Sequence, residues 1–451
     1  MNVKGLRVLV VGMARSGIAS AKLLASEGAL VTVNDSKPAK DLPDAMQSLK
    51  GVNYTNALGI DPMTLLDSTD MIVLSPGVPL SAPFAVEAKK RGIKVIGEIE
   101  LGYLFAKAPI VAITGTNGKT TTTALTGELF KAAGFNTHVL GNIGVPIAQE
   151  AKNTKPEDVI VAEVAGFQLE STERFHARSC AILNLTEDHL DRFKTMENYG
   201  AAKAMVLNNQ TPEDFAVFNA DDPMVSAMAK RAKGKVLWFS RKHEVEQGAF
   251  VRNGEIIFRM DGKEHVICRA DELKIPGSHN LENALAAVAV SLPVGVSPEA
   301  AAKALRDFSG VEHRIEFVCE KNGVRYINDS KATNPDSTVK AIEAIQRPTV
   351  LLLGGSNKNS DYTPVFNAFA GKVKAVVAYG FTKDQIERDA KKTNYSPIYI
   401  CDGSFQDAVM LAKSLAIEGD DVLLSPACAS YDMFNNFEER GRVFKELVRS
   451  F

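Results

Sequence analysis

The sequence predicts an α/β protein of three domains, each built on a largely parallel sheet. Short apolar runs alternate with segments of helical period along nearly the whole chain, which is typical of parallel strands joined by crossover helices. A chain of 451 residues is long enough for roughly three domains. The apolar runs also restart in three series, so we expect domains at residues 1–97, 98–310 and 311–451.

Composition and charge exclude several classes of protein. Hydrophobic residues make up 45% of the chain and charged residues 24%, as in ordinary globular proteins. The formal net charge of −2 gives no broad basic field, so neither nucleic acid nor an anionic membrane is an expected partner. No apolar run approaches the roughly 18 residues of a membrane span. The five cysteines are widely spaced and odd in number, which predicts reduced thiols in a cytoplasmic protein.

The first series of strands predicts a nucleotide-binding type of domain. It begins with RVLVVG at residues 7–12, continues with LVTVND and MIVLSPG, and ends near Gly97. The first strand runs into GMARSG, which has the outer glycines of a dinucleotide-binding turn but Ala14 in place of the middle glycine. Without that glycine the backbone cannot approach a pyrophosphate as closely, so NAD is disfavoured and another nucleotide-type ligand is expected.

The second series carries a shortened phosphate loop. Its first strand, PIVAITG at residues 109–115, leads into ITGTNGKTTTT. The common loop is G-x-x-x-x-G-K-[ST], but here the first glycine comes two residues late. Backbone N–H groups of such a turn bind phosphate oxygens, the lysine reaches the β- and γ-phosphates, and the following hydroxyl binds Mg²⁺. We therefore predict an ATP site formed by Gly115, Thr116, Asn117, Gly118, Lys119, Thr120 and Thr121.

Carboxylates at the ends of neighbouring strands suggest a metal site. Glu163 ends the strand VIVAE, and a buried acid is costly unless it has a partner or a role. The next strand ends in NLTEDHLDRF, which crowds Glu187, Asp188, His189 and Asp191 together. A capping acid and a solvated turn are the simpler interpretation. Beside a phosphate loop, which brings Mg²⁺, the metal site is favoured.

Three further segments of this series have less distinctive patterns. ENYGAAKAM predicts a helix carrying Lys203, which nothing nearby distinguishes from a surface lysine. In PGSHNLENALAAVAV, Asn280 and Asn283 precede an alanine-rich helix; they suit either its cap or a purine, and the cap is favoured. Between Ala249 and Leu273, N-G and D-G turns separate alternating strands and predict a small antiparallel sheet.

The third series combines strands with polar segments near their ends. The strands are VRYINDS, TVLLLGG, AVVAYG and VLLSPACAS, and the polar segments are EHR, NDSKATN, GGSNKNSDY and SPACASYDMFNNFEERG. Their cations and hydroxyls suit a substrate with carboxylates and a developing phosphate, although solvated loop lysines are an alternative. The residues concerned are Arg314, Ser330, Lys331, Thr333, Lys358 and Ser430.

In this order, and over essentially the whole chain, the motifs resemble those of the Mur ligases of peptidoglycan synthesis. GTNGKT is similar to that family's shortened phosphate loop, and GNIGVP, FQLE, NLTEDHLDR, EHR, NDSKATN and SPACAS with NFEERG strengthen the resemblance. It implies a Rossmann-like domain that binds a UDP substrate, a central ATPase domain and a Rossmann-like C-terminal domain that binds an amino acid. It also implies an ADP-releasing ligase that adds D-glutamate to UDP-N-acetylmuramoyl-L-alanine through an acyl phosphate. We expect the protein to be a cytoplasmic monomer.

The resemblance also implies roles for individual residues. Catalytic roles fall on Lys119, His189 and Lys203, the last as a lysine carbamylated by CO₂. Two Mg²⁺ ions would be held by Thr120, Glu163, His189 and Lys203. Nucleotide contacts would come from Asn280, Asn283, Arg314 and Asp329, and UDP-substrate contacts from Ser36, Lys37, Ser75 and Asn142. The D-glutamate site would contain Lys331, Thr333, Lys358, Ser430 and Phe437. One departure is Ala165-Gly166, which replaces the two serines usual before FQL.

Three other functions are compatible with parts of the sequence. A related ligase could add a different amino acid, but Lys331, Thr333 and Ser430 suit an acidic one. An NAD-linked oxidoreductase is disfavoured by Ala14. A non-catalytic nucleotide-binding regulator would have no need to keep Lys119, Glu163, His189 and Lys203 together.

Overall fold

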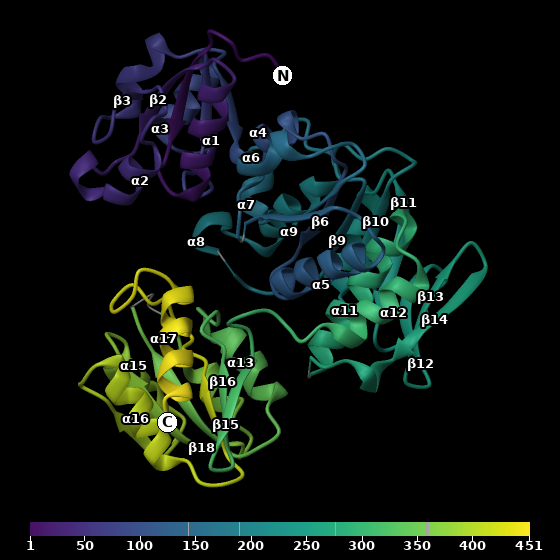
Figure 1. Ribbon diagram of the computed structural model, residues 1–451, viewed down its shortest axis with the longest axis vertical. Helices are drawn as coiled ribbons and strands as arrows, with labels where there is room; N and C mark the ends of the chain where they lie inside the picture. Colours follow the sequence, from purple (N-terminus) through teal and green to yellow (C-terminus); the bar gives the residue numbers. More distant parts are fainter. Residues whose placement is uncertain (143, 189, 276, 357–359) are drawn as a thin grey trace. The chain divides into compact units, whose positions relative to one another are not determined.

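The computed structural model describes residues 1–142, 144–188, 190–275, 277–356 and 360–451 (Figure 1). Two of the predicted site residues, His189 and Lys358, lie outside these ranges. The chain divides into two compact units: residues 1–273 with 281–308, and residues 274–280 with 309–451. The described strands form two sheets in the first unit and one in the second.

The first sheet is a parallel sheet in the order β3-β2-β1-β4-β5. Its strands are β1 (Arg7–Val11), β2 (Leu30–Asn34), β3 (Thr55–Asn56), β4 (Met71–Leu74) and β5 (Lys94–Gly97). One face packs on α1 (Arg15–Ser26), α2 (Pro43–Ser48) and α4 (Glu98–Phe105). The other packs on η2 (Pro62–Ser68) and α3 (Pro83–Lys90), while η1 (Ala39–Asp41) lies in a connection. Helices on both faces explain why the strands are apolar throughout.

The second sheet has the order β14-β13-β12-β11-β10-β9-β6-β8-β7. The parallel part contains β6 (Ile110–Thr114), β7 (Thr137–Gly141), β8 (Val159–Glu163), β9 (Ser179–Ile182), β10 (Phe215–Asn219) and β11 (Lys235–Ser240). The antiparallel strands predicted from the N-G and D-G turns are confirmed as β12 (Gly248–Arg252), β13 (Glu255–Met260) and β14 (Lys263–Arg269). They do not form a separate sheet. Because β12 pairs in parallel with β11, they extend the main sheet, and β14 is its outer strand (Figure 1).

Helices complete the central part of the first unit. They are α5 (Lys119–Ala132), α6 (Ile147–Glu150), α7 (Gly166–Leu169), α8 (Leu190–Phe193), α9 (Met196–Ala204), α10 (Pro223–Met228) and α12 (Pro298–Asp307). Short 3₁₀ turns lie in the connections: η3 (Ala151–Asn153), η4 (Met205–Leu207), η5 (Ala229–Arg231), η6 (Ala270–Glu272) and η7 (Leu292–Val294). Helices α7, α9 and α10 contribute to one apolar core with the sheet, and α5 contacts β7, β8 and α12.

The alanine-rich helix begins earlier than the capping interpretation requires. Helix α11 spans Ser278–Ser291 and starts directly after Gly277, whose φ of +97° turns the chain. Asn280 and Asn283 therefore lie within its first turns and do not precede it. The expectation that they cap this helix is wrong, because the glycine allows the backbone to enter the helix before either asparagine.

The third sheet lies in the second unit and has the order β15-β16-β20-β17-β18-β19. Its strands are β15 (Glu316–Lys321), β16 (Val324–Asn328), β17 (Thr349–Gly354), β18 (Val373–Tyr379), β19 (Ile398–Ile400) and β20 (Asp421–Leu424). Only β15 is antiparallel to its neighbour. Helices α13 (Pro335–Ala344), α14 (Thr363–Asn367) and α15 (Lys383–Lys392) pack on one face, and α16 (Phe405–Leu415) and α17 (Phe437–Arg449) on the other.

Three sequence expectations can be compared with the structure directly. The predicted α/β fold with three successive sheets is confirmed. The five cysteines are free thiols. Within the described ranges of the chain, no helix is both long enough and apolar enough to cross a bilayer.

Candidate active site

The phosphate loop connects β6 to α5 and depends on two glycines. Gly115 and Gly118 have φ values of +150° and +81°. A Cβ on Gly115 would lie 2.9 Å from the Cβ of Leu183, and one on Gly118 would lie 2.3 Å from Oδ1 of Asn283. Any side chain at these positions would be strained and would clash. The loop therefore packs closely against both the segment after β9 and helix α11.

Lys119 folds back over this loop. Its Nζ donates hydrogen bonds to the carbonyl oxygens of Gly115 at 3.0 Å and Thr116 at 2.7 Å. It is also the first residue of α5, whose first-turn N–H groups point out of the helix end. The ammonium group of Lys119 thus lies close to the positive N-terminal end of α5. This combination of a cation and a helix N-terminus binds phosphate.

Lys203 lies in the same site and is not a surface lysine. Its side chain is 1% exposed, and its Nζ donates to the carbonyl of Gly115 at 2.7 Å and lies 4.1 Å from the centre of the Tyr199 ring. Burial, together with the nearby charge of Lys119, lowers the pKa of Lys203 well below its usual range, although Asp188 and Glu163 act in the opposite direction. Burial therefore favours the neutral amine more than it would in an exposed lysine.

Glu163 provides a buried carboxylate at the end of β8. It is 2% exposed, and its Oε1 accepts a hydrogen bond from Nδ2 of Asn142 at 3.1 Å. The backbone N–H of Asn142 also donates to the carbonyl of Glu163 at 2.9 Å. Its Oε2 is buried and finds no hydrogen-bond partner in the described part of the chain. Because a buried carboxylate oxygen without a partner is costly, a ligand that paired with this atom would reduce that cost.

The predicted metal site stays a prediction, because the described residues do not include all of its members. Across the described residues no group of three or more His, Cys, Asp or Glu side chains converges as a metal site. His189 falls outside those residues, and Thr120 lies in the first turn of α5. The structure does bring Lys119 and Glu163 close to Lys203, because the charges of Lys119 and Glu163 both act on the pKa of Lys203.

Three residues predicted to contact the UDP substrate lie at the carboxyl edge of the first sheet. Ser36 and Lys37 follow β2, and Ser75 follows β4. The hydroxyl of Ser75 donates to the carbonyl of Gly12 at 2.6 Å. Asp35 accepts from the backbone N–H groups of Met13 at 2.8 Å and Lys37 at 3.0 Å. The turn after β1 is therefore held from both sides. The fourth residue, Asn142, follows β7 of the second sheet.

Asp329, Arg314 and Asn280, predicted nucleotide contacts, belong to the second unit. Asp329 accepts from the hydroxyl of Ser425 at 2.7 Å and from the N–H of Ile315 at 3.2 Å. Burial raises the pKa of Asp329 to about 6, while the positive charge of Arg314 opposes this rise.

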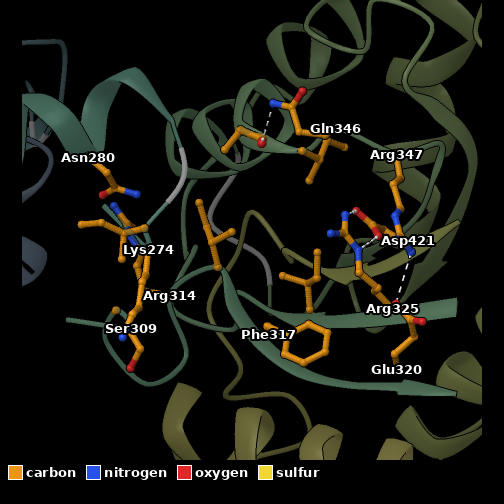
Figure 2. Close-up of a pocket in the computed structure, with 16 residues that line it drawn as sticks. Lys274, Asn280, Ser309, Arg314, Phe317, Glu320, Arg325, Gln346, Arg347 and Asp421 are labelled. Atoms are coloured by element: carbon orange, nitrogen blue, oxygen red, sulfur yellow. Dashed lines mark hydrogen bonds and ion pairs between the residues drawn. The ribbon is translucent and has the colours of Figure 1, made fainter. Parts of the chain in front are cut away.

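Arg314 and Asn280 line a pocket of about 480 Å³ in the same unit (Figure 2). Lys274 lies on their side of it. The opposite side carries two ion pairs, Arg325 with Asp421 at 2.7 Å and Arg347 with Glu320 at 3.4 Å. The cations there are already neutralised, so the side with Arg314 is the better place for an anionic ligand.

The predicted amino-acid site lies at the carboxyl edge of the third sheet. Nζ of Lys331 lies 5.2 Å from the centre of the Phe437 ring, a cation–π contact. Ser430 is buried and Thr333 half-buried, in the segments that follow β20 and β16. The structure thus brings Lys331 and Phe437 together, although they are far apart in the sequence.

Arg440 is a buried residue, beside the predicted amino-acid site, whose contacts the sequence did not reveal. It is 0% exposed in α17, and its guanidinium donates to Oγ and O of Ser330 at 2.9 and 2.8 Å and to the carbonyl of Cys428 at 3.1 Å. The hydroxyl of Ser330 in turn donates to the carbonyl of Phe437 at 2.8 Å. One arginine therefore ties together the segments that carry Lys331, Ser430 and Phe437. In the sequence it stands among charged residues like any exposed helix arginine.

Models of three protein domains match successive parts of the chain. The Mur ligase MurD-like N-terminal domain matches residues 6–97, the Mur ligase middle domain matches residues 113–291, and the Mur ligase glutamate ligase domain matches residues 313–428. Each match contains one of the three sheets or most of it.

Similar proteins and structures cover the chain from end to end. A UDP-N-acetylmuramoylalanine–D-glutamate ligase of Alkaliphilus metalliredigens is 49% identical over 452 aligned residues, covering 100% of this chain and 99% of that protein. The ligase of the same name from Clostridioides difficile is 44% identical and covers 100% of both. The crystal structure of UDP-N-acetylmuramate–alanine ligase from Thermotoga maritima has a TM-score of 0.62 at 20% identity, covering 99% of each chain, and supports the fold alone. Because of these matches, the chain belongs to the Mur ligase family.

Proposed function

We propose that this protein uses ATP to join D-glutamate to UDP-N-acetylmuramoyl-L-alanine, in peptidoglycan precursor synthesis. The observation that carries the proposal is identity of 44–49% over nearly the whole chain to proteins named for that reaction. The site agrees with an ATP-dependent ligase, because a phosphate loop with Lys119 adjoins a buried carboxylate and a buried lysine.

The reaction requires activation of a carboxylate, which is inert to amines until one oxygen becomes part of a leaving group. A carboxylate oxygen of the L-alanyl residue attacks the γ-phosphorus of ATP, the bond to ADP breaks, and an acyl phosphate forms. The amine of D-glutamate then attacks the acyl carbon. The tetrahedral adduct expels phosphate, the nitrogen loses a proton, and the amide is complete. Phosphoryl transfer of this kind depends mainly on positioning and on electrostatic stabilisation.

The chain offers a separate group of residues for each substrate. Lys119 and the first turn of α5 would bind the β- and γ-phosphates and stabilise charge as the phosphoryl group moves. Arg440 would hold the segments that carry Lys331, Ser430 and Phe437 in place without touching the substrate. The remaining contacts are proposed as Asn280, Asn283, Arg314 and Asp329 for the nucleotide, Ser36, Lys37, Ser75 and Asn142 for the UDP substrate, and Lys331, Thr333, Lys358, Ser430 and Phe437 for D-glutamate.

The site has groups that suit Mg²⁺. Thr120, Glu163, His189 and a carbamylated Lys203 would hold two ions, and the unpartnered Oε2 of Glu163 supports this assignment. The lowered pKa of Lys203 supports the carbamate, because CO₂ reacts with a neutral amine. The resulting carbamate would supply hard oxygen ligands, which Mg²⁺ prefers. Bound Mg²⁺ supplies charge neutralisation during phosphoryl transfer.

We also propose that the protein acts in the cytoplasm as a monomer with domains at residues 1–97, 98–310 and 311–451. Five free thiols support a reducing compartment. Each of the three sheets falls within one of these ranges, which supports the boundaries.

Isotope transfer tests both the substrate and the mechanism. UDP-N-acetylmuramoyl-L-alanine labelled with ¹⁸O in its carboxylate is incubated with ATP and D-glutamate, and the released phosphate is analysed by mass spectrometry. One labelled oxygen per phosphate is expected. Unlabelled phosphate would refute the acyl phosphate. Replacing D-glutamate by L-alanine, a diamino acid or L-glutamate should abolish ADP release; a faster reaction with one of these would reassign the amino acid.

A further inference from the structure

The phosphate loop is two residues shorter than the common form, and the neighbouring strand supports it. Strands β6 and β9 are parallel neighbours, and their hydrogen bonding continues beyond both strand ends. The N–H of Leu183 donates to the carbonyl of Thr114 at 2.9 Å, and the N–H of Thr116 donates to the carbonyl of Asn184 at 3.0 Å. The segment after β9 is therefore paired with the loop itself.

Asn184 makes the most specific of these contacts. Its Oδ1 accepts a hydrogen bond from the backbone N–H of Asn117 at 2.8 Å, and its Nδ2 donates to the carbonyl of Asn117 at 3.1 Å. One side-chain amide thus holds both backbone polar groups of a residue in the middle of the loop. Thr186 adds a third attachment, since its N–H donates to Oγ1 of Thr116 at 3.1 Å.

These contacts decide which polar groups of the loop are engaged by the protein itself. The N–H groups of Thr116 and Asn117 both donate to Asn184. Phosphate is then left to the first-turn N–H groups of α5 and to the ammonium of Lys119, which hydrogen-bonds to Gly115 and Thr116 of the same loop. Any movement of the Asn117 backbone would displace these groups relative to the phosphate.

We propose that Asn184 is a positioning residue for phosphoryl transfer: its side-chain amide fixes the backbone of Asn117 and thereby the start of α5 and Lys119. This inference rests on the proposed ATP-dependent function. Asn184 acts through the loop and touches no reacting atom. It also precedes Asp188 by four residues on the same segment, and the charge of Asp188 acts on Lys203. The amide therefore connects the loop to the segment that carries Asp188.

The test compares Asn184→Ala with a matched variant, Asn219→Ala. Nδ2 of Asn219 donates to the carbonyl of Leu183 at 2.9 Å, so it supports the same segment from β10. Its described side-chain hydrogen bonds involve Leu183 and Asp221, neither of which belongs to the phosphate loop. Loss of two hydrogen bonds should weaken ADP binding by Asn184→Ala roughly tenfold, while AMP, which has no β-phosphate, is affected less than twofold.

Kinetics and hydrogen exchange distinguish a loss of positioning of the phosphate loop from a general destabilisation of the segment after β9. For Asn184→Ala, kcat should fall roughly tenfold with saturating substrates, whereas the KM for D-glutamate should stay within twofold of the parent. Amide exchange at Asn117 should accelerate in this variant and not in Asn219→Ala.

Several outcomes would contradict the inference. Equal ADP affinity in Asn184→Ala and the parent would overturn it, and so would equal losses in both variants, which would indicate a general effect on the segment. An unchanged exchange rate at Asn117 would overturn it as well. A parent protein that bound neither ADP nor ATP would instead refute the proposed function, so the two failures are distinguishable.

Discussion

The substitution Glu98→Gln should remove much of the pH dependence of folding stability in the first unit. Glu98 is the first residue of α4 and is 2% exposed. Its Oε1 accepts from the N–H of Ala148 at 2.7 Å, whereas its Oε2 is buried and has no hydrogen-bond partner in the part of the chain that the structure describes. Burial raises the pKa of Glu98 from 4.5 to about 7, against the opposing effect of the Ala148 and Ile147 N–H groups.

The magnitude follows from the difference between the two pKa values. A rise from 4.5 to about 7, at 1.36 kcal/mol per pKa unit, corresponds to roughly 3 kcal/mol. The folded protein binds this proton more tightly than the unfolded chain does. Stability from this group is therefore fully present below pH 4.5, is lost as the pH rises to about 7, and changes no further above that value. Glutamine keeps an oxygen for Ala148 but cannot ionise, so it has no such dependence.

Urea unfolding of both proteins between pH 5 and 8 measures this difference. The only tryptophan, Trp238, lies in β11 of the first unit, so its fluorescence reports on the part of the protein that contains Glu98. The free energy of unfolding of the parent should fall by about 2–3 kcal/mol more than that of Glu98→Gln across this range. Subtracting the two curves removes the contributions of the other titrating groups. Parallel curves would show that Glu98 is ionised at ordinary pH, and the burial argument would fail.

Substitutions at three further residues test the site. Lys203→Arg should be inactive, because it keeps a positive charge and cannot form the carbamate, while Lys203→Ala should be partly reactivated by acetate; near-parental activity of Lys203→Arg in an ADP-release assay would exclude the carbamate. Lys119→Ala should reduce turnover about 10²–10³-fold through loss of one electrostatic contact, and turnover within a few-fold of the parent would reject the loop assignment. Arg440→Lys should raise the KM for D-glutamate roughly tenfold and leave the KM for ATP unchanged, since it breaks several of the hydrogen bonds that hold the amino-acid segments. Val448→Ala, which opens a cavity in the same helix, should lower the thermal midpoint with an unchanged KM; equal KM changes in both variants would assign the Arg440 effect to stability alone.

Local sequence patterns were sufficient for most of the fold. Apolar runs predicted the longer strands, because a strand covered by helices on both faces must be apolar throughout. The N-G and D-G turns predicted the antiparallel strands, because these dipeptides adopt the φ values that tight hairpins need. The shortest strands, β3 and β19, have too few residues for a recognisable period, and the structure forms them only by pairing with β2 and β18.

The phosphate loop was also predictable, because glycine, lysine and threonine at a fixed spacing after a strand are a local requirement of phosphate binding. The helix that carries Lys203 was also predictable from local sequence, but the burial of the Lys203 side chain was not. The carbonyl that Lys203 contacts belongs to Gly115, and no short pattern reports a contact between residues 88 positions apart. The expectation that Asn280 and Asn283 cap the alanine-rich helix was wrong, because the helix begins directly after Gly277, before either asparagine.

The identity of the strands, the phosphate loop and the family relationship follow from the order of residues along the chain, because they depend on local periodicity and on motifs at fixed spacing. The environment of each side chain depends on tertiary packing. Lys203 has a lowered pKa because α9 places it beside Lys119 and away from water. Glu98 has a raised pKa because the helix that follows β5 is buried. Arg440 ties together the segments after β16 and β20 because its guanidinium donates to carbonyl oxygens of both. Desolvation and hydrogen bonding act through space, so residues of the same type acquire different chemistry only when the chain is folded.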